Sequence, residues 1–160
     1  MFSHGVIGAL LFAVAGIVYR HTHTHTRDLD TLSGMDLSRA LPFAAFSFVI
    51  ASAASMGIPG FSGFAAEVTI LIGTWKSYPM AVFVVGVGMV LVGAFTLRAL
   101  KKSFFGDSQS AGSFASEPIT VAEKLGAGLL MFATLATGLY PKLLLDRIMP
   151  AVEAMRFLKP

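Results

Sequence analysis

The sequence predicts an all-α, polytopic bundle of transmembrane helices, with about four spans, one of them interrupted, and an amphipathic helix at its C-terminal end. First, 55% of the 160 residues are hydrophobic and only 13% are charged, which is too apolar for an ordinary soluble domain of this length. Second, the apolar residues gather in long runs, and roughly 20 such residues in a helix cross a bilayer. Third, glycines and a proline break the longest run. We expect residues 1–160 to form a single membrane domain.

Residues 2–19 are predicted to form the first span, which ends at Arg20, a side chain that can reach the interface. We expect this stretch to be retained, because it lacks the basic start and the cleavage site of a signal peptide. His4 opens the span, as a member of a proton relay or as an interfacial histidine satisfied by water or backbone. The polar residues 20–40 follow as a loop with three His-Thr repeats at 21–26. Without cysteines or paired carboxylates at suitable spacing, we expect a solvated loop and no metal site.

The second span is predicted within residues 41–75, a run too long for one straight helix and too short for two complete spans and a turn. Pro59 lacks an amide donor and clashes with the preceding turn, so the helix should break near 57–62. Unpaired backbone at membrane depth must be buried in protein or line a wet cavity. We therefore expect the break to face inward. The residues assigned to the break are Gly57, Pro59, Gly60 and Gly63.

Glu67 is the only residue of the 41–75 run that can carry a charge, and it lies about one helical turn beyond the break. A charged side chain near the bilayer centre costs on the order of 2.5–3.5 kcal/mol on insertion scales. A buried glutamate with a movable lysine partner can load and release a proton, which is what a proton relay requires. Alternatively, Glu67 has a structural role, bonded to the loosened backbone or hydrated near the interface.

The third span is predicted over residues 80–100, and it ends in a group of cations. These side chains are interfacial anchors, or Lys101 or Arg98 takes part in a proton relay. The group consists of Arg98, Lys101 and Lys102.

The last span is predicted over residues 125–141, and its small residues are suited to close helix packing. They are Gly126, Gly128 and Gly138. An amphipathic helix over residues 143–158 should then lie at the membrane surface, interrupted or started afresh at Pro150.

Composition excludes several functions. The absence of cysteine excludes disulfides, thiolate metal sites and cysteine-held iron–sulfur clusters within this sequence. A net charge of +3 spread over loops and ends suits anionic lipid head groups and gives no reason to expect nucleic acid as a partner. Neither a nucleotide-binding motif nor a catalytic residue for redox or hydrolytic chemistry is apparent.

Several motifs together resemble the antiporter-like membrane subunits of respiratory complex I (NADH-quinone oxidoreductase), specifically the chain M, or ND4-type, subunit. The resemblance covers nearly the whole sequence, and its most specific part is the glycine–proline break followed by Glu67. The motifs are Ser3-His4-Gly5, the Thr-His-Thr-Arg tail that ends at Arg27, the segment from Gly57 to Glu67, and the segment from Leu97 to Gly106.

The resemblance implies a part of a proton-translocating subunit in a bacterial inner (plasma) membrane, corresponding to roughly the final third of a longer chain. Glu67 would then be the outlet-side carboxylate of a half-channel. The family's earlier Glu and Lys residues have no counterpart here, so another membrane subunit must supply them with the missing N-terminal helices. The resemblance also implies that NADH, FMN, iron–sulfur clusters and quinone belong to partner subunits, so the chain would be part of a translocating enzyme without a redox centre of its own.

Two alternatives remain open. The chain is instead a subunit of a cation/proton antiporter, an inorganic-carbon transporter or a membrane-bound hydrogenase, where the same break would serve ion exchange. Or it is a structural fragment that packs in a complex without conducting protons.

Overall fold

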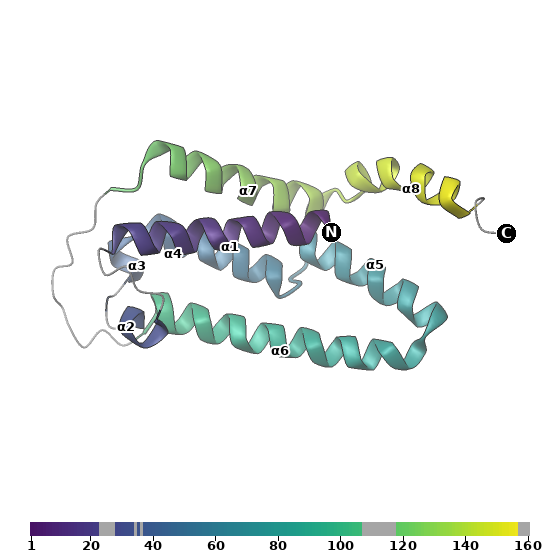
Figure 1. The fold of residues 1–160 in the computed structure, drawn as a ribbon, viewed down its shortest axis with the longest axis horizontal. Coiled ribbons are helices and arrows are strands. Elements are labelled where there is room, and N and C mark those ends of the chain that lie inside the picture. The colour runs from purple at the N-terminus through teal and green to yellow at the C-terminus, as the bar shows by residue number, and fades with distance from the viewer. Residues whose placement is uncertain (23–27, 34, 36, 107–117, 157–160) are drawn as a thin grey trace.

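The computed structural model describes residues 1–22, 28–33, 35, 37–106 and 118–156, and every regular element within these ranges is an α-helix (Figure 1). The prediction of an all-α membrane helix bundle is confirmed. The helices are α1 (Phe2–His21), α2 (Leu29–Ser33), α3 (Leu37–Ala40), α4 (Pro42–Ser55), α5 (Ser62–Ser77), α6 (Pro79–Phe104), α7 (Val121–Leu139) and α8 (Lys142–Arg156).

Helix α1 lies at the centre of the arrangement and packs against α4 and α7 (Figure 1). Helices α5 and α6 form a hairpin joined at Tyr78, and Pro79 takes the first position of α6, where its missing amide donor removes no helical hydrogen bond. Helices α5 and α8 both extend past the N-terminal end of α1. Helix α5, which follows the helix break, and helix α8, which follows α7, therefore lie on the same side of the bundle.

The core is formed mainly between α1 and α4. Leu10, Val14 and Ile17 of α1 are buried and recur at helical spacing. They belong to the same core cluster as small residues of α4, which let the two helices approach closely. Those residues are Ala44, Ala45 and Ala51. Helix α6 buries residues only towards its C-terminal end, and its middle is only partly covered by neighbouring helices.

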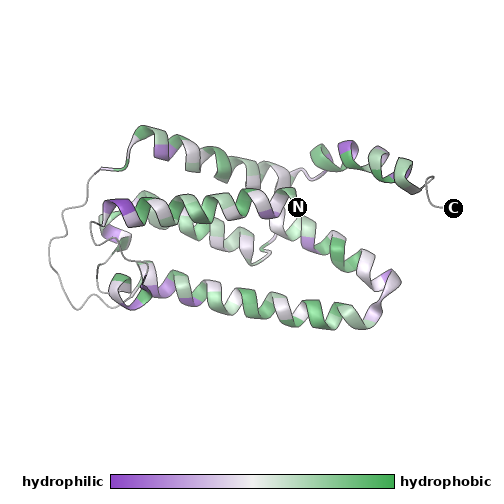
Figure 2. Cartoon of the chain, viewed as in Figure 1, coloured by the Kyte–Doolittle hydropathy of each residue, from purple (hydrophilic) through white to green (hydrophobic). Residues whose placement is uncertain are grey.

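By length and composition, α1 and α6 can each cross a membrane, and the pair α7 and α8, bent by 71° between them, adds a third span if it acts as one. This is fewer than the predicted four, because the apolar run of residues 41–75 divides into helices of 14 and 16 residues. In Figure 2 hydrophilic residues gather at the end of the bundle where α1 and α6 finish and α7 begins. The polar side chains at this end of the bundle can lie at a membrane surface.

The predicted interruption at Pro150 is wrong, because α8 runs through this residue. Every described side chain from 145 to 155 is exposed, so water can bond the carbonyl of Asp146 that a residue with an amide hydrogen would have engaged. Residues 157–158 of the predicted tail lie outside the described residues.

Candidate functional site

The helix interruption expected at 57–62 occupies residues 56–61 in the structure. Helix α4 ends at Ser55, and Gly57 and Gly60 then take positive φ angles of 68° and 101°, which side chains other than glycine rarely adopt. The amide of Ile58 donates to the carbonyl oxygen of Ala53 at 3.1 Å, so part of the freed backbone is paired inside the loop.

Two further glycines let backbone segments meet at the break. A Cβ atom at Gly63, in the first turn of α5, would collide with the carbonyl oxygen of Ala54 at the end of α4. A Cβ atom at Gly138 of α7 would collide with the backbone of Gly60 and Phe61. The break is therefore held between α4 and α7, and α7 can approach it only because residue 138 has no side chain.

Glu67 lies in α5, and its carboxylate turns back onto the break. A Cβ atom at Gly57 would collide with Oε2 of Glu67, so the carboxylate occupies the space that a side chain at Gly57 would take. Oε2 is buried and accepts no hydrogen bond from any residue that the structure describes. A buried polar atom of this kind needs water or a further partner.

The carboxylate faces a cavity that provides room for such a partner. The cavity has a volume of about 220 Å³ and is lined by His4 and Ser3 of α1, Ser55 of α4, and Glu67. Its remaining lining is apolar apart from Gly63. It is far larger than the space of about 15 Å³ that one water molecule requires. We call it the carboxylate cavity. It brings together two of the three side chains that the sequence assigned to a proton relay.

The third, Lys101, is not in this cavity. It lies near the C-terminal end of α6, where its side chain is exposed. Because α5 and α6 pair as a hairpin about Tyr78, the level of Glu67 falls near residue 89 of α6. Lys101 is therefore displaced along the helix by 12 residues, about 18 Å.

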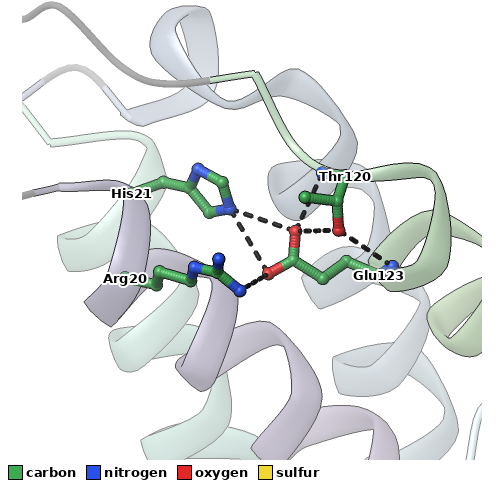
Figure 3. Close-up of polar contacts among 4 residues, drawn as sticks. All are labelled: Arg20, His21, Thr120 and Glu123. Carbon is green, nitrogen blue, oxygen red and sulfur yellow. Dashed lines mark hydrogen bonds and ion pairs between the residues drawn. The ribbon is translucent and has the colours of Figure 1, made fainter.

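A second polar cluster joins α1 to α7 at the other end of the bundle (Figure 3). His21 is 1% exposed, and its Nε2 lies 3.1 Å from Oε2 of Glu123. Nη1 of Arg20 lies 3.5 Å from Oε1 of the same carboxylate. Thr120 and Glu123 form a capping box at the start of α7, in which the Thr120 hydroxyl donates to Oε2 at 2.7 Å and accepts from the Glu123 amide at 3.3 Å.

This cluster differs chemically from the carboxylate cavity. Glu123 precedes the apolar residues 125–141 and so lies at the end of its span. Burial would raise the pKa of the Glu123 carboxyl, but hydrogen bonds from Thr120 and His21 outweigh burial and lower this pKa from 4.5 to about 2. Glu123 therefore stays ionised at physiological pH and acts as an anchor. Glu123 was not among the site residues predicted from the sequence, although the Thr-x-x-Glu spacing of a capping box could have marked it.

The histidine tract supplies only His21 to the described structure, since residues 23–27 lie outside it. Within the described ranges, no three His, Asp or Glu side chains are grouped closely enough to hold a metal ion. At the same end of the bundle, Lys102 of α6 forms an ion pair with Asp30 of α2. Both side chains are partly exposed, and such pairs contribute little stability.

Comparison with known proteins identifies the family. The family described as NADH:quinone oxidoreductase/Mrp antiporter, TM matches residues 1–93. A protein named NAD(P)H-quinone oxidoreductase chain 4 1 from a Picosynechococcus species is 35% identical over 152 residues, which cover 89% of this chain and 28% of that protein. The protein of the same name from Synechococcus elongatus is 33% identical over 149 residues, covering 89% of this chain and 27% of that protein.

A third relative, NAD(P)H-quinone oxidoreductase chain 4 from a Synechococcus species, is 33% identical over 164 residues, covering 97% of this chain and 29% of that protein. The chain thus spans less than a third of the length of the curated relatives it matches. It is an integral membrane protein whose sequence aligns with these relatives over most of its own length. The chain belongs to the NADH:quinone oxidoreductase/Mrp antiporter transmembrane family, and within that family to the ND4-type, or chain 4, subunits.

Proposed function

We propose that this chain supplies the outlet-side half-channel of a proton-translocating membrane subunit in an NADH-quinone oxidoreductase. The observation that supports this most is the position of Glu67. Its carboxylate lies against the helix break, with a buried oxygen that accepts no hydrogen bond from the described residues, and it faces a cavity that can hold water. Ionisable groups inside membrane spans typically mark ion or proton pathways.

The surroundings of Glu67 suit proton transfer. A carboxylate can take a proton from water in the cavity and release it again, and the imidazole of His4 lines the same space as a second protonatable group. The glycines of the break permit backbone angles that a regular helix forbids, so local rearrangement beside the carboxylate is sterically possible. We include Lys101 in the proposal as a cation at the far end of α6, outside the carboxylate cavity.

The half-channel requires partners. The relatives are named as chains of an NAD(P)H-quinone oxidoreductase, and we propose that the other membrane subunits of such a complex, with the earlier Glu and Lys residues of the family, complete the proton path. We assign NADH, FMN, iron–sulfur clusters and quinone to partner subunits, since this sequence has no cysteine to hold a cluster and no nucleotide-binding motif. The complex is proposed to lie in the bacterial inner membrane, with this chain as part of its translocating machinery.

The test is Glu67→Gln in the assembled complex, with proton transport measured in vesicles alongside the rate of electron transfer to quinone. Glutamine keeps the size of the side chain but cannot carry a proton. We expect proton transfer through this subunit to fall roughly 100-fold, the lower range for a positioned acid–base group, while the complex still assembles. The matched control is Glu153→Gln on exposed α8, which should transport protons like the wild type.

Proton transport by Glu67→Gln equal to that of Glu153→Gln would contradict the proposal and favour a structural fragment. The subunits that copurify in mild detergent give a separate answer. Nicotinamide-oxidising and quinone-binding subunits are the expected result. Antiporter-type, carbon-transport or hydrogenase partners would assign the same half-channel to one of those complexes instead.

A further inference from the structure

Three hydroxyl groups form a hydrogen-bonded chain from α1 through α5 to α7. The hydroxyl oxygens of Ser3 and Ser62 are 2.9 Å apart, and those of Ser62 and Thr134 are 2.8 Å apart. Both distances are typical of hydroxyl–hydroxyl bonds. Ser62 is 4% exposed and Thr134 is fully buried. Ser62 is the first residue of α5, so the helix break itself delivers the central hydroxyl.

We call these three hydrogen-bonded residues, Ser3, Ser62 and Thr134, the hydroxyl bridge, and it lies where two cavities meet. Ser3 lines the carboxylate cavity and also a second cavity of about 220 Å³ beneath the start of α8. The second cavity is lined by the hydroxyl-bearing residues Ser62, Thr69 and Thr137 as well as by apolar side chains of α8. We call it the hydroxyl cavity. Ser3 therefore faces the space that contains Glu67 on one side and its hydrogen-bond partner Ser62 on the other.

We propose that Ser3 and Ser62 carry protons between the carboxylate cavity and the hydroxyl cavity, so that the outlet of the half-channel opens beneath α8. Thr134 is a positioning residue in this scheme. Its hydroxyl is buried in α7 and holds Ser62 in the rotamer that also reaches Ser3. The inference rests on the proposed function, because it needs a proton supplied at Glu67.

The transfer leaves the Glu67 carboxyl ionised, ready for the next proton, and leaves both serines as they were. The Glu67 carboxyl releases its proton to water in the carboxylate cavity, and that water passes a proton to a lone pair of the Ser3 oxygen. Ser3 gives its original hydroxyl proton to Ser62, and Ser62 gives its own to water in the hydroxyl cavity. One proton has moved, both serines are again neutral, and rotation of the two hydroxyls restores the starting orientation.

Ser3 and Ser62 suit this role because a serine hydroxyl both donates and accepts hydrogen bonds. Most of the other side chains that line the two cavities are apolar and can do neither. Hydroxyls that serve only packing in a helix usually bond their own backbone. Ser47 of α4 does so, donating to the carbonyl oxygen of Phe43 at 2.8 Å. Ser3 and Ser62 instead bond each other across two helices.

The experiment is Ser62→Ala in the assembled complex, with proton transport and electron transfer measured as for Glu67→Gln. The matched control is Ser47→Ala, which removes an equally buried hydroxyl outside the bridge. We expect proton transport on the order of 100-fold slower for Ser62→Ala and unchanged for Ser47→Ala. Ser3→Ala, in the less buried first turn of α1, is the second variant and should match Ser62→Ala.

Thr134 is tested by conservative rescue. Thr134→Val removes the hydroxyl but keeps the shape and should slow proton transport, whereas Thr134→Ser should restore it. If Thr134 served packing alone, Thr134→Val would transport protons faster than Thr134→Ser, because valine fills the site better than serine.

The outcomes separate the two proposals. Normal transport by both Ser62→Ala and Ser3→Ala, with transport lost in Glu67→Gln, would overturn the hydroxyl bridge and leave the proposed function standing. Normal transport by Glu67→Gln would overturn both. Transport lost in Ser62→Ala and Glu67→Gln, with Ser47→Ala unaffected, is the result that supports the bridge.

Discussion

Replacing Gly138 by alanine tests whether α7 holds the helix break in place. Gly138 lies beyond the matched residues 1–93 of the family description, and only the structure shows what it contacts. A Cβ atom there would collide with the carbonyl oxygen of Gly60 and with the backbone of Phe61. Backbone cannot rotate away as a long side chain would, so either α7 or the break must shift.

The magnitude follows from two opposing terms. Alanine favours a helix over glycine by about 0.5–1 kcal/mol, and forcing an extra carbon into a packed contact costs about 1–3 kcal/mol. Gly128→Ala on the same helix is the matched control, because a Cβ atom there meets no described atom within 4 Å. The helix term is common to both variants, so their difference isolates the steric cost. We expect Gly138→Ala to be less stable than Gly128→Ala by about 1–3 kcal/mol.

The assay is thermal unfolding of the complex purified in mild detergent, followed together with proton transport at a temperature where both variants are folded. Gly138→Ala should unfold at a lower temperature than Gly128→Ala. It should also transport protons more slowly, because a shift of the break displaces Ser62. Equal stability of the two variants would refute the reasoning that α7 contacts the break at this residue.

Two further predictions concern the ends of the bundle. Gly57→Ala should destabilise the chain by about 1–2 kcal/mol, because the φ of 68° at this residue is unfavourable for alanine. The variant should also displace the Glu67 carboxylate and slow proton transport. Gly73→Ala is the control, since the space around Gly73 is open, and it should have neither effect. Glu123→Gln should cost about 1–3 kcal/mol by removing the carboxylate that faces buried His21 at 3.1 Å. Since folding lowers the Glu123 pKa from 4.5 to about 2, the stabilisation is complete above pH 4.5 and lost as pH falls toward 2. Acid unfolding of wild type and Glu123→Gln should therefore converge near pH 2, and a constant difference down to that pH would contradict this.

Composition and apolar run lengths sufficed to predict the all-α membrane bundle, because the bilayer leaves few alternatives to helices. The position of the interruption also followed from local residues, since Pro59 and its neighbouring glycines disfavour a continuous helix whatever surrounds them. Pro150 likewise lacks an amide hydrogen, but no glycine lies beside it, and α8 continues through it. The difference is that residues 56–61 have α7 packed against them, while α8 is exposed and tolerates the lost hydrogen bond.

The site was less accessible from sequence because its members are distant in the chain. Glu67 stood out as a lone ionisable residue in an apolar run, but nothing local indicates that its carboxylate meets Gly57 or shares a cavity with His4. Ser62 and Thr134 are ordinary residues of membrane helices, and they acquire a possible role only because their hydroxyls are 2.8 Å apart.

A series of contacts connects the helix break, the Glu67 carboxylate and α7. Gly138 contacts the backbone of residues 60–61, the next residue carries the central hydroxyl, and Gly57 at the other end of the break contacts Glu67. A closer approach of α7 at Gly138 would press on the backbone of residues 60 and 61 and so move Ser62, which follows them directly. Residues beyond the matched segment 1–93 thus constrain Glu67 inside it, and under the proposed function α7 belongs to the half-channel as much as the broken helix does.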